Sequence, residues 1–292
     1  MSTEKARFHS IWVAIFCLWW GILSQGIGGL AGARAEEVRE SAAPATPASP
    51  SPVGRAEQVP GRVLEVPGPV RFELTSRSEL KYEQTFFEQS GYRMRAILSG
   101  SYALPRLKMS FGFDEIPLVR YEVPGRSEDW MLGDIILRYG YVPYLSPRQD
   151  LGVVAVANLT LPTGDFEGGA GEGRYNLEPR LFLPYRVNPF YTVVPGIYYQ
   201  FTLAKKEAGV QDSKFLTLRL INIFYPTRGS YLIVEPRLFR DFESNATSGE
   251  LRFQAGTMIT PNLNAYLEYS AGIGGERYCN GWVGAALRYF FR

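Results

Sequence analysis

The chain has 292 residues and a formal net charge of +2, and 14% of its residues are aromatic. The small net charge argues against a nucleic-acid or strongly acidic partner. The only histidine is His9, and it falls in a leader expected to be removed. The mature chain would then lack His-dependent catalysis and a His-based metal site, so we expect no enzyme, no metal and no cofactor.

Residues 1–35 have the pattern of a secretory signal peptide. Lys5 and Arg7 precede an apolar run over residues 11–23, and Ala33-Arg34-Ala35 supplies an A-x-A cleavage site. The run is shorter than the roughly 20 residues that span a bilayer, so an uncleaved anchor is the less favoured alternative. The mature chain is expected to begin at Glu36 and to carry one cysteine, Cys279, which cannot form an internal disulfide.

Residues 36–69 are rich in Ala, Pro and Ser. Such a tract cannot bury a core, and we expect a disordered or polyproline-like lead-in.

The remaining residues, 70–292, show a period of two with one apolar face in segment after segment, and no convincing amphipathic helix. This pattern predicts an all-β fold, a transmembrane antiparallel up-and-down barrel of about twelve strands. The weakest candidate is the first segment, and ten strands are the fallback. The segments are residues 79–88, 92–102, 106–121, 130–144, 149–162, 174–187, 190–203, 213–224, 230–242, 248–260, 262–273 and 281–291.

Two kinds of connection alternate between these segments. Brief, proline-bearing ones fall at residues 103–105, 145–148, 188–189, 226–229 and 261–262, and mostly longer, polar ones at 122–129, 163–173, 204–212, 243–247 and 274–280. Bacterial barrels have short periplasmic turns and longer outer loops, which this alternation matches.

Charged residues of both signs share one face of nearly every segment. A charge facing lipid at mid-depth would cost about 2–4 kcal/mol, so this face is predicted to line the lumen. Leu181 and Leu218, of opposite parity, are predicted to face lipid. The predicted lumen-lining residues are Asp134, Arg138, Glu178, Arg180, Arg219, Glu235, Arg237, Arg252, Glu268 and Arg288.

The sequence Glu-Pro-Arg-Leu-Phe occurs twice, at residues 178–182 and 235–239. Its charges either line a conduit or form a salt-bridge network that fills the interior, and the intermediate size of the barrel favours the network. Because proline lacks a ladder donor, Pro179, Pro195 and Pro236 are expected to mark bulges or bends.

A glycine-rich stretch, residues 168–173, superficially resembles a phosphate-binding loop. The next residues start a strand and not a helix, so an outer loop is the better interpretation. Its carboxylates Asp165, Glu167 and Glu172 are interpreted as solvated charges in preference to a divalent-cation site.

Several motifs resemble the outer-membrane β-barrel family linked to the meta-pathway of phenol degradation. They are Gly133-Asp-Ile-Ile-Leu-Arg-Tyr139, the strand end Leu161-Pro-Thr-Gly-Asp165, and Asn176-Leu-Glu-Pro179. The chain departs from the family pattern at Arg138, where the family has Lys, and at the terminal Arg292, where an aromatic is common. The resemblance covers about residues 80–292. It implies a barrel of about twelve strands that passes small, often aromatic or apolar, compounds across the outer membrane.

The sequence thus predicts a passive channel or uptake transporter for small solutes in the outer membrane of a Gram-negative-type bacterium, after signal-peptide export. Its expected partners are outer-membrane lipid, the outer-membrane assembly machinery and a small-molecule solute. The alternative is a structural or surface-display barrel whose lumen is sealed by salt bridges.

Overall fold

The computed structural model describes residues 74–87, 91–123, 126–275 and 280–291. The predicted leader and the Pro-rich lead-in lie outside these residues. Twelve long strands form the wall: β1 (Arg77–Phe87), β2 (Gly91–Leu104), β3 (Met109–Val123), β6 (Ile135–Leu145), β7 (Gly152–Leu161), β8 (Arg174–Phe182), β10 (Tyr191–Lys205), β11 (Lys214–Phe224), β12 (Ser230–Asp241), β13 (Thr247–Met258), β14 (Leu263–Gly275) and β15 (Gly281–Phe290). Shorter elements adjoin them: η1 (Pro105–Leu107), β4 (Arg126–Ser127), β5 (Met131–Leu132) and β9 (Tyr185–Asn188).

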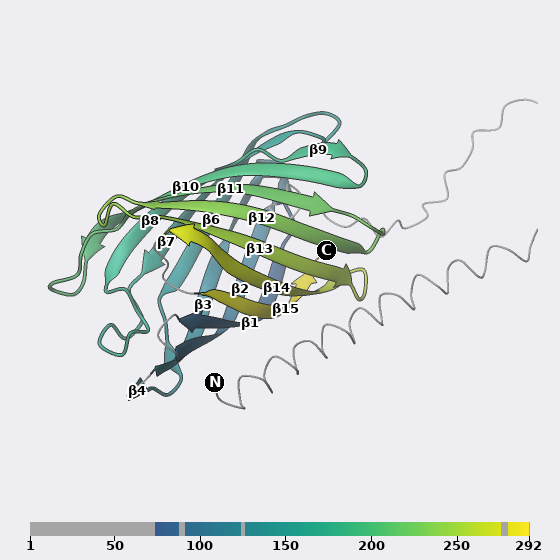
Figure 1. Ribbon diagram of the computed structural model, residues 1–292. Coiled ribbons are helices and arrows are strands. Elements are labelled where there is room, and N and C mark those ends of the chain that lie inside the picture. The colour runs from purple at the N-terminus through teal and green to yellow at the C-terminus, as the bar shows by residue number, and fades with distance from the viewer. Residues whose placement is uncertain (1–73, 88–90, 124–125, 276–279, 292) are drawn as a thin grey trace, which may run out of the picture. The chain divides into compact units, whose positions relative to one another are not determined.

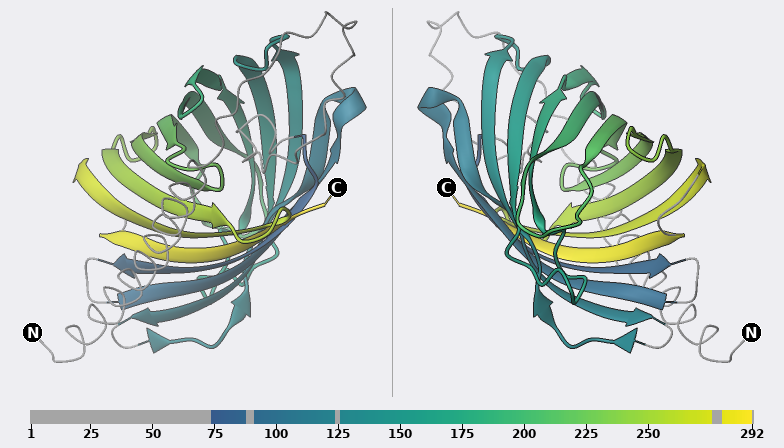
Figure 2. Two further views of the ribbon diagram at one scale, coloured as in Figure 1. Left: turned by 90° about the vertical axis from the view of Figure 1, so that its right-hand side faces the viewer. Right: turned by 90° about the vertical axis from the view of Figure 1, so that its left-hand side faces the viewer.

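The wall is a closed antiparallel barrel (Figure 1). Each long strand pairs with its neighbours in chain order, and β15 pairs with β1 to close the ring. The prediction of a twelve-stranded all-β transmembrane barrel is confirmed. Its weakest candidate, residues 79–88, corresponds to β1, which pairs along its length with both β2 and β15. Figure 2 shows the wall curving round from the first strands to the last.

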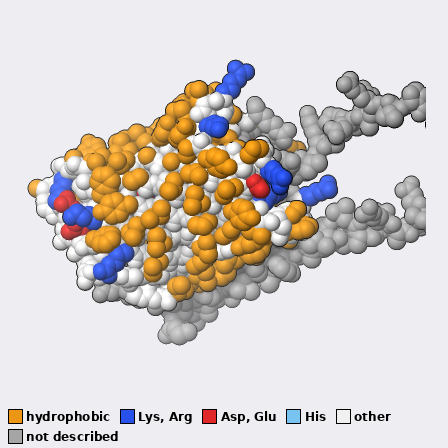
Figure 3. All heavy atoms as spheres, turned by 90° about the horizontal axis from the view of Figure 1, so that it is seen from above, with side chains coloured by type: hydrophobic (Ala, Val, Ile, Leu, Met, Phe, Trp, Pro, Cys, Tyr) orange, Lys and Arg blue, Asp and Glu red, His pale blue; other side chains and the backbone are white. Residues whose placement is uncertain are grey.

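The outer face of the barrel is apolar, as period-two strands facing lipid require. Leu181, near the end of β8, is 41% exposed, and Leu218, in the middle of β11, is 42% exposed. Figure 3 shows charged side chains gathered at the two ends of this face and hydrophobic side chains covering the band between them. Among the described residues, no helix has the length and apolar character needed to cross a membrane.

Of the three prolines predicted to mark bulges or bends, none lies at a β-bulge. The register is unchanged across Pro179, Pro195 and Pro236, and what changes is that pairing toward one neighbour lapses at Pro179 and at Pro236. A missing N–H removes a ladder bond without requiring an extra residue. Bulges occur elsewhere, and the one on β3 next to Phe113 matters for the interior.

Buried apolar side chains cluster at one end of the barrel interior. We call this the apolar floor. It lies at the end that carries the short turns, and it has two clusters that share Phe182 as a packing partner: Val194, Ile223, Tyr231, Tyr266 and Ala286 in one, and Val142, Val154 and Val156 in the other.

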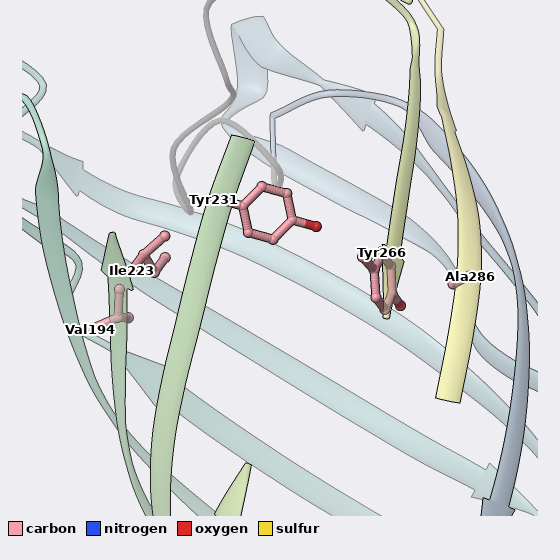
Figure 4. Packing of buried hydrophobic residues seen from close by; sticks show 5 residues of the cluster. All are labelled: Val194, Ile223, Tyr231, Tyr266 and Ala286. Atoms are coloured by element: carbon pink, nitrogen blue, oxygen red, sulfur yellow. The ribbon is translucent and has the colours of Figure 1, made fainter. Parts of the chain in front are cut away.

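The apolar floor is assembled across many strands. Figure 4 shows side chains of the larger cluster extending inward from β10, β11, β12, β14 and β15. A Cβ at Gly256 would lie 2.3 Å from the ring of Tyr231, so glycine on β13 leaves the room that this tyrosine occupies. Leu74, just before β1, packs against the valine cluster.

Candidate functional site

Beyond the apolar floor, the barrel encloses a cavity of about 570 Å³. Charged and aromatic side chains from both halves of the wall line it. Six of the ten predicted lumen-lining residues are among them: Glu178, Arg180, Arg219, Arg237, Arg252 and Arg288.

Glu235, on β12, is the most heavily shared acid of the interior. Its side chain is 1% exposed and lies behind three arginines. Arg219 and Arg237 both donate through Nε to Oε1 of Glu235, the Arg237 bond being 2.7 Å, and Arg252 Nη1 donates to Oε2 at 3.3 Å. Arg219 and Arg237 are directly opposite each other on β11 and β12, a pairing of like charges that the shared carboxylate offsets.

Arg252 continues the network to the other side of the barrel. It also binds Glu268 of β14, and Lys81 of β1 lies 2.6 Å from the second oxygen of Glu268. The ring of Trp282, on the intervening β15, has Lys81 Nζ 4.8 Å and Arg252 Cζ 5.6 Å from its centroid. These cation–π contacts fill the space between two ion pairs with an aromatic body.

From Lys81 the pairs run onward to β3. Lys81 binds Glu83 at 2.9 Å, Glu83 lies 3.5 Å from Arg95 on β2, and Arg95 binds Glu115 on β3. Asp114, the preceding residue, also faces the interior because a β-bulge lies at this point of β3. A bulge places two consecutive side chains on the same side of a strand, and here it delivers two carboxylates to the cavity.

Asp114 organises the opposite half of the network. It accepts from Arg138 of β6 at 3.0 Å, from Asn158 of β7 at 2.6 Å and from Arg180 of β8 at 3.2 Å. Arg180 also binds Glu178.

Tyr198, on β10, joins the two halves of the network. Its buried ring lies 4.8 Å from the guanidinium carbon of Arg180 and 4.9 Å from that of Arg219, and Arg219 donates to its hydroxyl. We call the resulting belt of contacts, which has members on every wall strand, the charged girdle. Each of its buried charges has an oppositely charged partner, as burial in a wall facing lipid demands.

The other predicted residues lie in different surroundings. Glu235, Glu268 and Arg138 belong to the charged girdle but are not part of the cavity lining. Arg288, one of the six lining residues, binds Glu79 beside the ring of Tyr266.

Asp134 does not line the cavity. It precedes β6 and accepts from the backbone N–H groups of Gly164 at 2.9 Å and Glu172 at 2.6 Å, so it shapes the loop between β7 and β8. Burial raises the pKa of this carboxyl.

Sequence reasoning missed several members of the charged girdle. Glu79, Lys81 and Glu83 alternate with Leu80 and Tyr82, the same period-two pattern that identified the other strands. Asp114 and Glu115 are adjacent, and only the bulge allows both to point inward.

The loop of residues 163–173 leads directly into the strand β8 and not into a helix, as predicted. Its Glu172 carboxylate is bound by Arg174 at 3.1 Å and by the Asn176 amide at 2.7 Å. Within the described part of the chain, no group of three or more His, Cys, Asp or Glu side chains is placed to hold a metal ion.

Solved structures share this architecture. An outer-membrane channel of the COG4313 group from Pseudomonas putida F1 matches 80% of this chain and 99% of its own, with a TM-score of 0.62 and 13% identity. The fold is that of an outer-membrane β-barrel. The NanC porin matches 74% of this chain and 99% of its own, with a TM-score of 0.50 and 10% identity. No family model and no curated protein sequence matches the chain.

Proposed function

We propose that the protein is an outer-membrane channel that admits small solutes by passive diffusion. The observation that carries this proposal is the cavity inside the barrel wall, about 570 Å³ in volume and lined by charged and aromatic side chains. A barrel that served only to occupy the membrane would gain more from a continuous apolar core, since each buried charge must be desolvated.

Solutes would pass through the charged girdle in contact with side chains that ion pairs hold in position. Arg180, Arg219, Arg237, Arg252 and Arg288 present guanidinium edges to the cavity. Rings of charged side chains set the selectivity of aqueous pores. No covalent reaction is part of the proposal, because the route offers a solute only hydrogen bonds, charges and aromatic contacts.

The surroundings of the protein follow from the same proposal. The apolar outer band would contact lipid of the outer membrane of a Gram-negative-type bacterium, reached after export through the predicted leader. The terminal strand β15, with Tyr289 and Phe291 exposed beside each other, would be the segment that the outer-membrane assembly machinery engages. The link to phenol degradation rests on the sequence resemblance, and solutes that include aromatic compounds are its expected cargo.

Planar-bilayer recording tests the proposal. Protein purified from membranes in detergent is inserted into the bilayer, and current is recorded across a salt gradient. Discrete conductance steps with a non-zero reversal potential are expected. Silence from protein that a heat-dependent gel shift shows to be folded would contradict the channel.

The alternative, a structural or surface-display barrel with a sealed lumen, is favoured by one observation. The charged girdle is continuous around the wall, and the apolar floor closes the turn end with buried valines and tyrosines. The hydroxyl of Tyr231, in the apolar floor, donates to Asn264 at 3.1 Å. If the lumen is sealed, neither the unaltered protein nor Tyr231→Ala would conduct. A channel narrowed by the apolar floor predicts larger steps for Tyr231→Ala.

A further inference from the structure

The part of the cavity wall formed by β11, β12 and β13 combines a row of three arginines with a pair of phenylalanines. Arg219, Arg237 and Arg252 stand side by side there, and we call them the arginine wall. Their shared acid, Glu235, is 1% exposed and lies behind them, while their own side chains are 14–15% exposed and line the cavity. Glu250 of β13, opposite Arg237 and 3.1 Å from it, is the one carboxylate of this wall that also lines the cavity. With three guanidinium groups to this one carboxylate, the surface that the wall presents to a solute is cationic.

An aromatic pair adjoins the arginine wall. Phe215 on β11 and Phe239 on β12 both line the cavity, with ring centroids 5.8 Å apart and planes inclined by 32°. Phe239 follows Arg237 by two residues on the same face, and Phe215 precedes Arg219 by four. Because a strand rises about 3.3 Å per residue, the Cα atoms of Arg237 and Phe239 are separated by about 7 Å along the strand. Both phenylalanines lie on the side of the arginines away from the short turns.

The opposite side of the cavity carries acids. Asp114 and Glu115 project from the bulge of β3, which is six strands from β12 in either direction around the barrel, and their side chains are 24% and 27% exposed. Asp114 and Glu115 have arginine partners of their own, so it is the arginine wall, with more cationic than acidic side chains at the cavity surface, that would attract an anion.

We propose that this wall is a binding site for aromatic carboxylates. The carboxylate would accept from the guanidinium edges of the arginine wall, a charge-assisted contact that planar guanidinium and carboxylate groups make well. The ring would pack on Phe215 and Phe239, which line the cavity beside the arginine wall. This inference rests on the proposed channel function, whose cargo it specifies.

The test is calorimetric titration of the detergent-purified protein with three probes. Benzoate has ring and charge, benzamide has the ring without the charge, and acetate has the charge without the ring. Benzoate is expected to bind at least about tenfold more tightly than either of the others, since each lacks one of the two contacts. Equal affinities for the three probes, or no heat from benzoate, would overturn the proposal.

Variants locate the site. Arg219→Gln is expected to weaken benzoate binding at least about tenfold and to leave benzamide unchanged. Arg240→Gln is the matched control, because Arg240 lies on β12 but binds Asn245 and Thr247 at the loop end, outside the cavity lining. Should Arg219→Gln fail to fold, Phe215→Leu keeps every charge, and it is expected to reduce the preference for benzoate over acetate. Preference unchanged in Phe215→Leu would refute the aromatic part.

The binding site and the channel function can be refuted independently of each other. Protein that conducts ions but binds the three probes alike would retain the channel and lose the carboxylate site. Protein that prefers benzoate but gives no current would retain the site and lose the conduit.

Discussion

The charged girdle and the apolar floor are made by the same strands, at successive positions of the same inward face. On β12, Tyr231 belongs to the apolar floor and Glu235 to the charged girdle, and on β10 Val194 and Tyr198 divide in the same way. In the apolar floor the side chains pack directly against one another, whereas the charged girdle surrounds the cavity of about 570 Å³. A barrel interior can therefore close by apolar contact at one depth and remain polar at the next.

The largest effect on stability is expected in the charged girdle, at Glu235. Glu235→Ala would leave Arg219, Arg237 and Arg252 without their shared buried partner, and we expect a loss of about 3–5 kcal/mol in the free energy of unfolding. Urea titration of the protein in detergent, followed by gel migration without heating, measures it. Glu243→Ala is the control: Glu243 binds Lys214 in an exposed pair, and its loss should cost at most about 1 kcal/mol. A loss at Glu235 as small as at Glu243 would contradict the buried network.

A smaller effect is expected at the other node of the charged girdle. Arg180→Ala removes one partner from Asp114, which keeps Arg138 and Asn158, and one from Glu178. The expected loss is about 2 kcal/mol, the cost of leaving a buried acceptor under-satisfied. It would appear as a lower unfolding temperature in the same detergent, and an unchanged melt would show that Arg180 is not part of the packed interior.

Substitutions in the apolar floor should change the free energy of unfolding only through lost packing. Val142→Ala removes the equivalent of two methylene groups from a side chain that is 1% exposed, for an expected loss of about 1.5 kcal/mol. Val187→Ala, at an exposed position of β9, supplies the matched control. Equal unfolding free energies for the two variants would mean that the apolar floor is not a packed core.

The smallest effect is local. Asp134→Ala should leave global unfolding nearly unchanged but speed hydrogen exchange at the Gly164 and Glu172 amides by about tenfold, since each loses its acceptor. Mass spectrometry of peptides covering residues 162–173 reads this directly. Unchanged exchange there would show that another contact holds the loop.

The wall of the barrel was predictable because lipid on one side and charge on the other impose a period of two on every strand. That pattern located all twelve segments, including β1. Which side chains point into the lumen was less predictable, because it depends on where each strand begins and where a bulge shifts its register. Asp134 was assigned to the lumen on the expectation that its strand covered residues 130–144, whereas β6 begins at Ile135. Asp114 and Glu115 were missed because a bulge leaves no period-two trace.

The proline predictions show the same limit. The backbone N–H donor that proline lacks can be read from the sequence. Whether the neighbouring strand tolerates the missing hydrogen bond or shifts its register depends on that neighbouring strand. At Pro236 the pairing with β11 lapses between Val234 and Arg237 and resumes in the same register, so the gap is tolerated.

Cysteine modification during single-channel recording tests the central claim, that solutes cross through the charged girdle. Thr217 lines the cavity and its neighbour Leu218 is exposed on the outer face. In a Cys279→Ser background, Thr217→Cys and Leu218→Cys are each treated with a water-soluble, charged thiol reagent. The account predicts a stepwise fall in current for Thr217→Cys and none for Leu218→Cys. Current that is insensitive at Thr217, or blocked equally at Leu218, would contradict it.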